Sequence, residues 1–206
     1  MGDAILAGFS RRGLFAFVLV ACSCSQRMGA RALPTLPPEV IVDVVEENYD
    51  VRGRTVQEIR LSLALSASSE LGPGITGLHR WNIRWGYGYQ QGITSCDVVS
   101  VPIEITSRIV SPRWTERDGA DRELVAMWEE YITALRAHEL THRELSYLAA
   151  RDFATELGRL TTPLCETIEA LVRTTGQQIL ERYEERNREF DEESQGTINW
   201  PPDPSG

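Results

Sequence analysis

Clusters of basic residues are missing from this chain of 206 residues, whose formal net charge is −9. A protein that binds nucleic acid through its phosphates needs Lys and Arg side chains gathered on one face, in many cases with aromatic residues among them. The sequence has no such cluster, so we do not expect nucleic acid as a partner. Its 42% hydrophobic and 25% charged residues are otherwise typical of a globular protein.

A hydrophobic run long enough for a permanent membrane-spanning helix is also missing. Such a helix needs about 20 apolar residues, whereas the apolar run near the N-terminus covers only residues 13–21. The run follows Arg11 and Arg12 and ends at Cys22, which is the layout of a secretory signal. We therefore predict a signal peptide over residues 1–21 and contact with the membrane through a lipid anchor only.

The end of this apolar run indicates where the protein is located. Residues 19–22, LVAC, resemble a bacterial lipobox, in which the cysteine becomes the lipidated first residue, and Ser23 is typical of outer-membrane sorting. We expect a lipoprotein of the bacterial outer membrane or periplasm, with residues 22–38 as lipid anchor and flexible tether. Two alternatives stay open. Residues 10–15 also fit a twin-arginine export signal, and cleavage after Ala32 would release a soluble protein.

Cysteine is scarce, with four residues in the whole chain. Cys22 and Cys24 belong to the processing region, which leaves Cys96 and Cys165 as the pair inside the folded domain. The oxidising envelope favours a disulfide between them, with two free buried thiols as the alternative. Without CxxC spacing, this pair does not predict a metal site.

Residues 39–196 have the length of one domain, and their N-terminal half has the patterns of β-strands. The run 40–45 is rich in β-branched residues, and residues 78–87 and 96–109 alternate between apolar and polar side chains. A glycine-containing loop over 86–94 suits an antiparallel hairpin between the last two segments. The pattern therefore predicts a small antiparallel sheet.

A short helix is expected between the first strand and this hairpin. Thr55 and Glu58 have the spacing of a capping box, which marks the start of a helix. The periodicity predicts that the helix runs to about Ala67, with Ile59, Leu63 and Leu65 turned inward.

From Asp121 the apolar period changes from two to about 3.5, which predicts one long amphipathic helix to about residue 158. Thr162-Pro163, as N-cap and first helical residue, predicts a second helix antiparallel to the first. Its charged residues beyond Glu184 read as a solvated end, and residues 197–206 as an irregular tail. The fold class is therefore α+β, with the small sheet packed on a long helix hairpin, as in zincins.

Histidine is rarer still: the chain has three, and two of them lie in the sequence HELTH at residues 138–142. His138 and His142 are four residues apart and continue the apolar stripe of the predicted helix, so both face the interior. This HExxH arrangement is typical of zinc hydrolases, in which the two histidines bind the metal and the glutamate, here Glu139, acts as general base on the bound water. Two buried histidines with ordinary hydrogen bonds are the alternative.

A hydrolytic zinc site takes a third protein ligand and keeps one position for water. Leu145 and Leu148 stand where the metzincin extension requires Gly and a third His, so that extension is excluded. The remaining candidates are downstream carboxylates and the third histidine of the chain: Glu166, Glu169, Asp191, Glu192, Glu193 and His79.

Together with these motifs, the chain resembles the bacterial domain-of-unknown-function family number nine-two-two, whose members are described as predicted secreted zinc-dependent proteases. The similar blocks are residues 49–53, 81–85, Cys96, Trp128, 138–142, Cys165 and 190–196. In the last block Asp191 matches the family pattern, so the resemblance implies that it is the third ligand or a partner of a ligand. Phe190, Ser194 and Gln195 stand where the family has Tyr, Thr and His. If that His binds metal, Gln195 would weaken the site.

The sequence therefore predicts a zinc metallopeptidase of the bacterial envelope that acts on a peptide or protein substrate. The alternative is a non-catalytic envelope lipoprotein, either a pseudoenzyme or a partner-binding scaffold, with a structural or vestigial metal site.

Overall fold

The computed structural model describes residues 37, 40–72, 75–194 and 198–201. The predicted signal peptide, the lipidation of Cys22 and all of the tether except Pro37 lie outside the described residues, so they stay predictions. None of the described helices is both long enough and apolar enough to cross a membrane.

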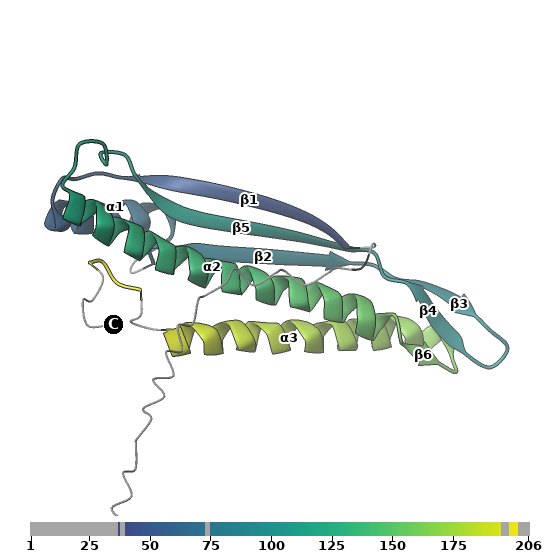
Figure 1. The fold of residues 1–206 in the computed structure, drawn as a ribbon. Helices are drawn as coiled ribbons and strands as arrows, with labels where there is room; N and C mark the ends of the chain where they lie inside the picture. The colour runs from purple at the N-terminus through teal and green to yellow at the C-terminus, as the bar shows by residue number, and fades with distance from the viewer. Residues whose placement is uncertain (1–36, 38–39, 73–74, 195–197, 202–206) are drawn as a thin grey trace, which may run out of the picture. The chain divides into compact units, whose positions relative to one another are not determined.

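The described chain has an α+β fold, as predicted: most strands precede two long helices, α2 and α3 (Figure 1). In chain order the elements are β1 (Val40–Val51), α1 (Val56–Glu70), β2 (Leu78–Trp85), β3 (Gly88–Gln91), β4 (Cys96–Ser100), β5 (Ile103–Trp114), α2 (Arg122–Leu157), β6 (Thr161–Thr162), the 3-10 turn η1 (Cys165–Thr167) and α3 (Ile168–Ser194).

The main sheet has three strands in the order β1-β5-β2, which leaves β2 at one edge. β2 pairs with β5 in antiparallel fashion, but β1 pairs with β5 in parallel, from Val40 beside Ile103 to Val51 beside Trp114. The prediction of a purely antiparallel sheet was therefore wrong for β1. A parallel pair needs a long crossover connection, and no local sequence pattern reveals such a pairing.

A second, smaller sheet contains β3, β4 and β6. The predicted strand over residues 96–109 is divided at Pro102, because proline has no N–H to continue the hydrogen-bond ladder. β4 therefore pairs with β3 and β6, whereas β5 joins the main sheet. The predicted antiparallel pairing is therefore confirmed for residues 78–85 with 103–110, but the two segments are not joined by a simple loop, since β3 and β4 lie between them.

The first two helices begin at side-chain caps. Thr55 accepts a hydrogen bond from the N–H of Glu58, as the capping box predicts, but Leu65 is 64% exposed and not turned inward. Asp121 caps α2 by accepting from the N–H of Glu123. The prediction of one long helix up to residue 158 is confirmed.

α3 begins later than predicted. Thr162 is not its N-cap, since it pairs with Cys96 in the β4–β6 ladder, and the helix starts only after η1. The predicted disulfide between Cys96 and Cys165 is confirmed and joins β4 to η1, with the two Cα atoms 5.1 Å apart. α3 then runs beside α2 and continues through the charged run beyond Glu184 (Figure 1).

Candidate metal centre

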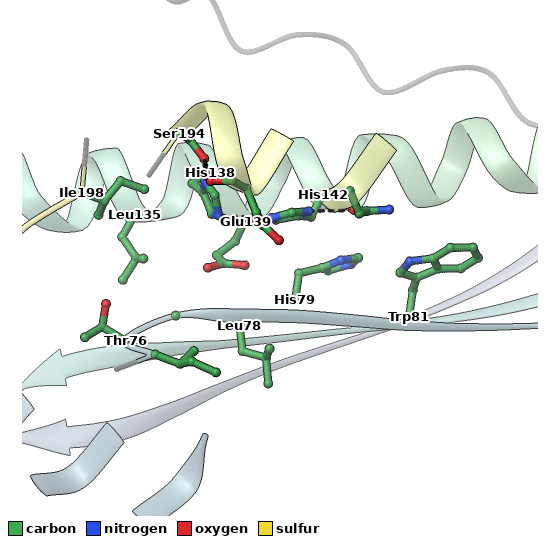
Figure 2. Close-up of a pocket in the computed structure, with 14 residues that line it drawn as sticks. Thr76, Leu78, His79, Trp81, Leu135, His138, Glu139, His142, Ser194 and Ile198 are labelled. Atoms are coloured by element: carbon green, nitrogen blue, oxygen red, sulfur yellow. Dashed lines mark hydrogen bonds and ion pairs between the residues drawn. The ribbon is translucent and has the colours of Figure 1, made fainter. Parts of the chain in front are cut away.

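Two histidines on neighbouring turns of α2 point to the same place. The Nε2 atoms of His138 and His142 lie 3.1 Å apart, and their rings meet nearly edge to face, at an interplanar angle of 80°. His142 is buried and His138 half-buried, as the stripe of α2 predicts. Figure 2 shows both rings on the side of α2 that faces α3 and β2.

α3 supplies a carboxylate to this pair of nitrogens. Asp191 Oδ1 lies 2.8 Å from His142 Nε2 and 3.2 Å from His138 Nε2. In a tetrahedral zinc site with bonds of 2.0–2.1 Å, neighbouring ligand atoms are separated by roughly 3.3 Å. The three atoms therefore have the spacing of one face of such a site. Within the described residues, no other group of His, Cys, Asp and Glu has this arrangement.

Two hydrogen bonds outside the cluster, both made by Asn187, set the tautomer of His142. Its Nδ1 lies 2.7 Å from Asn187 Oδ1, and Asn187 Nδ2 donates to the carbonyl of Tyr183 at 2.6 Å. The amide is thus oriented with its oxygen toward the imidazole, so Nδ1–H donates and Nε2 keeps its lone pair for the centre.

The tautomer of His138 is set in the same way, by a hydrogen bond to its Nδ1. Its Nδ1 lies 3.2 Å from Ser194 Oγ, whose hydrogen is donated to the carbonyl of Phe190 at 2.6 Å. The hydroxyl oxygen therefore accepts from Nδ1–H, and Nε2 faces Asp191. Burial, and secondarily the neighbouring His142, lower the pKa of His138, which favours the neutral ring. Two lone pairs and a carboxylate so close together repel one another unless a cation lies between them.

Glu139 lies beside this centre but outside the cluster. It is only 4% exposed, and burial raises the pKa of its carboxyl group to about 7, with a smaller contribution from the charge of Asp191. The backbone N–H of His79 donates a hydrogen bond to the carboxylate. Gly77 makes room for it, since a Cβ at that position would lie 2.6 Å from Glu139 Oε1.

The other predicted ligands lie elsewhere. His79 bonds to Ser107 Oγ through Nε2 at 2.8 Å, and burial lowers its pKa to about 4. Its ring is stacked on that of His142 with the centroids 6.4 Å apart, but it does not join the cluster. The four remaining glutamates are exposed and outside the cluster: Glu166, Glu169, Glu192 and Glu193.

Glu166 and Glu169 lie near the start of α3, so the helix rise of 1.5 Å per residue separates Glu169 from Asp191 by roughly 33 Å. The structure thus brings together His138, His142 and Asp191. Gln195, where the family has His, lies outside the described residues.

The centre opens into a cleft of about 510 Å³. One wall is formed by residues 75–79 and Trp81, which lead into and along the edge strand β2, and the other by α3 through Asn187, Asp191 and Ser194. In Figure 2, Thr76, Leu135 and Ile198 lie at one end of the cleft and Trp81 at the other. A long polymeric ligand could therefore lie between β2 and α3.

Two residues of the site were missed by the sequence reasoning. Asn187 was assigned to a solvated helix end, although two steps of four from Ile179, through Tyr183, lead directly to it. That periodicity was the available signal. Gly77 carried no comparable signal, because its role depends on the approach of α2 to the start of β2.

The fold and the site define an α+β domain in which an HExxH helix and an aspartate from a neighbouring helix form a candidate metal centre. The chain belongs to the family described as bacterial protein of unknown function (DUF922), whose model matches residues 46–197. This range includes His138, Glu139, His142 and Asp191, so the predicted family resemblance is confirmed. The chain has no match among curated proteins or among solved structures.

Proposed function

We propose that the protein is a zinc-dependent metallopeptidase of the bacterial envelope, with Glu139 as general base. The observation that carries the proposal is the convergence of His138 Nε2, His142 Nε2 and Asp191 Oδ1 within 2.8–3.2 Å of one another, at the bottom of an open cleft. Three ligands leave the fourth position of a tetrahedral ion free for water or substrate.

The donor set favours zinc among the common cations. Two neutral imidazoles suit zinc, copper, iron or nickel, whereas calcium and magnesium prefer oxygen ligands. One added carboxylate gives the two-histidine, one-carboxylate set found in zinc peptidases. A zinc ion bound there would lower the pKa of a water molecule and polarise the carbonyl group of a substrate.

Glu139 has the properties of the proton carrier in amide hydrolysis. Its carboxylate is in the same cleft, and the backbone N–H of His79 orients it. It would take one proton from the attacking water and deliver it to the nitrogen of the breaking C–N bond, so that the amine leaves uncharged. Without bound metal, burial already holds the pKa of Glu139 at about 7, near the working range of such a group.

The position of β2 supports a peptide as substrate. An edge strand has unpaired backbone groups to which an extended chain can add as a further strand. Leu78 and His79 of this edge, with Gly77 directly before it, line the cleft next to Glu139. A peptide bound there would bring its backbone carbonyls past the candidate metal centre.

The test uses the full exported chain, its Glu139→Gln variant and a mixture of unstructured peptides. We expect about one zinc per chain by elemental analysis of both proteins, and chelator-sensitive hydrolysis by the wild type only. General-base catalysis typically contributes 10²–10⁴-fold, so the variant should be slower by that factor. A wild-type protein without stoichiometric metal would refute the proposal. Metal without any hydrolysis would favour the non-catalytic scaffold.

A further inference from the structure

A second cavity of about 270 Å³ adjoins the cleft at its Thr76 end. The two cavities share three lining residues, Ile75, Thr76 and Ile198, so they adjoin one another at these side chains. Figure 2 shows Thr76 and Ile198 at the end of the site opposite Trp81.

The second cavity is predominantly apolar on its inner side. Leu63 and Ala67 of α1 and Tyr131 of α2 are buried there, at 2–3% exposure. Ala64, on the outer part of α1, leaves space because its side chain is a single methyl group. Arg60, Ser68 and Asn199, which are exposed, add polar groups to the outer side of the lining. The buried inner side of the cavity therefore suits an apolar group.

The remaining wall is a short C-terminal segment, residues 198–201, that is held in place by Trp200. The indole ring meets Trp128 and Tyr131 edge to face, with centroids 5.7 and 5.6 Å apart. Its Nε1–H donates to the carbonyl of Val56 at 3.0 Å. Aromatic contacts of this kind, together with a satisfied N–H, fix the position of the wall in advance of binding.

We infer that this second cavity is a specificity subsite that receives one large apolar side chain of the substrate peptide. The identity of the occupant rests on the proposed function. A peptide that follows β2 from Trp81 toward residue 75 passes Glu139 and arrives at the shared wall of the two cavities. Side chains alternate along an extended chain, so one of them faces α1 at that point. The volume is sufficient for a single residue such as Phe or Leu.

Binding is measured separately from turnover. Blocked pentapeptides, acetyl-Gly-Gly-Xaa-Gly-Gly-amide with Xaa as Phe, Leu, Ala or Asp, are titrated into the full chain carrying Glu139→Gln, with tryptophan fluorescence as readout because Trp200 lines the cavity. Burying a Phe or Leu side chain contributes about 1.5–3 kcal/mol, so these two peptides should bind at least tenfold more tightly than the Ala and Asp peptides.

A cavity-filling variant and a matched control test whether the second cavity is the source of the preference for the Phe peptide. Ala64→Phe fills the cavity from its exposed side, and we expect it to reduce the Phe-over-Ala preference to less than threefold without weakening the Ala peptide. Leu65→Phe adds an aromatic ring at the next position, which is 64% exposed and does not line the cavity, and should keep the full preference.

Equal binding of the four peptides, or a preference that survives Ala64→Phe, would overturn the inference. Hydrolysis by the wild-type chain distinguishes this failure from that of the proposed function. Peptides that are cleaved without apolar preference contradict the subsite alone. Peptides that bind with the preference, lose it in Ala64→Phe and are never cleaved contradict the peptidase alone.

Discussion

Substitution of Glu139 by Gln should stabilise the metal-free protein. The carboxyl group is 4% exposed, and its pKa is raised from 4.5 to about 7, first by burial and second by the charge of Asp191. At pH 8 the group must therefore ionise in an environment that disfavours its charge. Glutamine has nearly the same shape without that charge.

The sign and size of the effect follow from linkage. Below pH 4.5 the group is neutral in both the folded and the unfolded chain, so it costs nothing. Between pH 4.5 and about 7 only the unfolded chain ionises, and stability falls by about 1.4 kcal/mol for each pH unit. Above pH 7 the full cost is about 3 kcal/mol. An unpaired amide N–H in the variant lowers the free energy of unfolding by about 1 kcal/mol. The net gain in stability above pH 7 should therefore be about 2 kcal/mol.

Urea unfolding in the presence of chelator, at pH 5 and pH 8, measures this difference. The wild-type chain should lose more stability than Glu139→Gln between the two pH values, and saturating zinc should reduce the gap, since a nearby cation favours the carboxylate. Glu130→Gln, an exposed position on the same helix, controls for the change in net charge. Parallel pH profiles for wild type and Glu139→Gln without metal would refute the reasoning.

Three further variants test other parts of the structure. Asn187→Ala removes the acceptor of His142 Nδ1–H and should weaken zinc binding 10–100-fold, as measured by competition with a chromogenic chelator. Gly77→Ala places a Cβ 2.6 Å from Glu139 Oε1, so peptide hydrolysis should fall at least tenfold while the metal content is unchanged. Replacement of Cys96 and Cys165 by Ala opens a loop closed across 69 residues and should cost about 4 kcal/mol in urea unfolding.

Each of these has a result that contradicts it. Zinc affinity equal to wild type in Asn187→Ala would mean that the outer hydrogen bond does not orient the imidazole. Gly86→Ala is the control for Gly77→Ala, because its Cβ would meet only the ring of Pro102 at 3.4 Å. Equal activity in both glycine variants would exclude the close approach to Glu139. A loss below 1 kcal/mol for the cysteine pair would show that the unfolded chain is not constrained by this bridge.

The parts of the fold that were predictable are those set by local periodicity. α2 repeats its apolar residues every 3.5 positions over ten turns, so its length, its inner face and the inward direction of His138 and His142 could be predicted. The Cys96–Cys165 bridge was predictable from the presence of two cysteines inside the folded domain together with the expected oxidising compartment. Neither inference needs knowledge of how distant elements pack.

The parts that could not be predicted depend on partners far apart in sequence. β1 pairs with β5 across a connection that contains α1 and three other strands, and its own residues say nothing about direction. Gly77 matters only because Leu135 and Glu139 approach it from α2. Such contacts arise from how the elements pack, and this packing cannot be predicted from the residue pattern of any single segment.

Asp191 is an intermediate case, because its place in the site depends on the rotational phase of α3. Trp85 packs so closely on Gly176 that a Cβ there would lie 2.8 Å from the indole ring, which holds the buried face of α3 toward β2. Successive residues turn by about 100° around a helix, so Glu192 lies roughly 180° from Tyr183, on the side away from α2. Asp191, one residue earlier, is near enough to the inner face to reach both imidazoles. A phase error of one residue along α3 would therefore remove the third ligand, and the close packing at Gly176, some 15 residues (about 22 Å) from the metal centre, is one of the contacts that oppose it, together with the buried Ile179 and Tyr183.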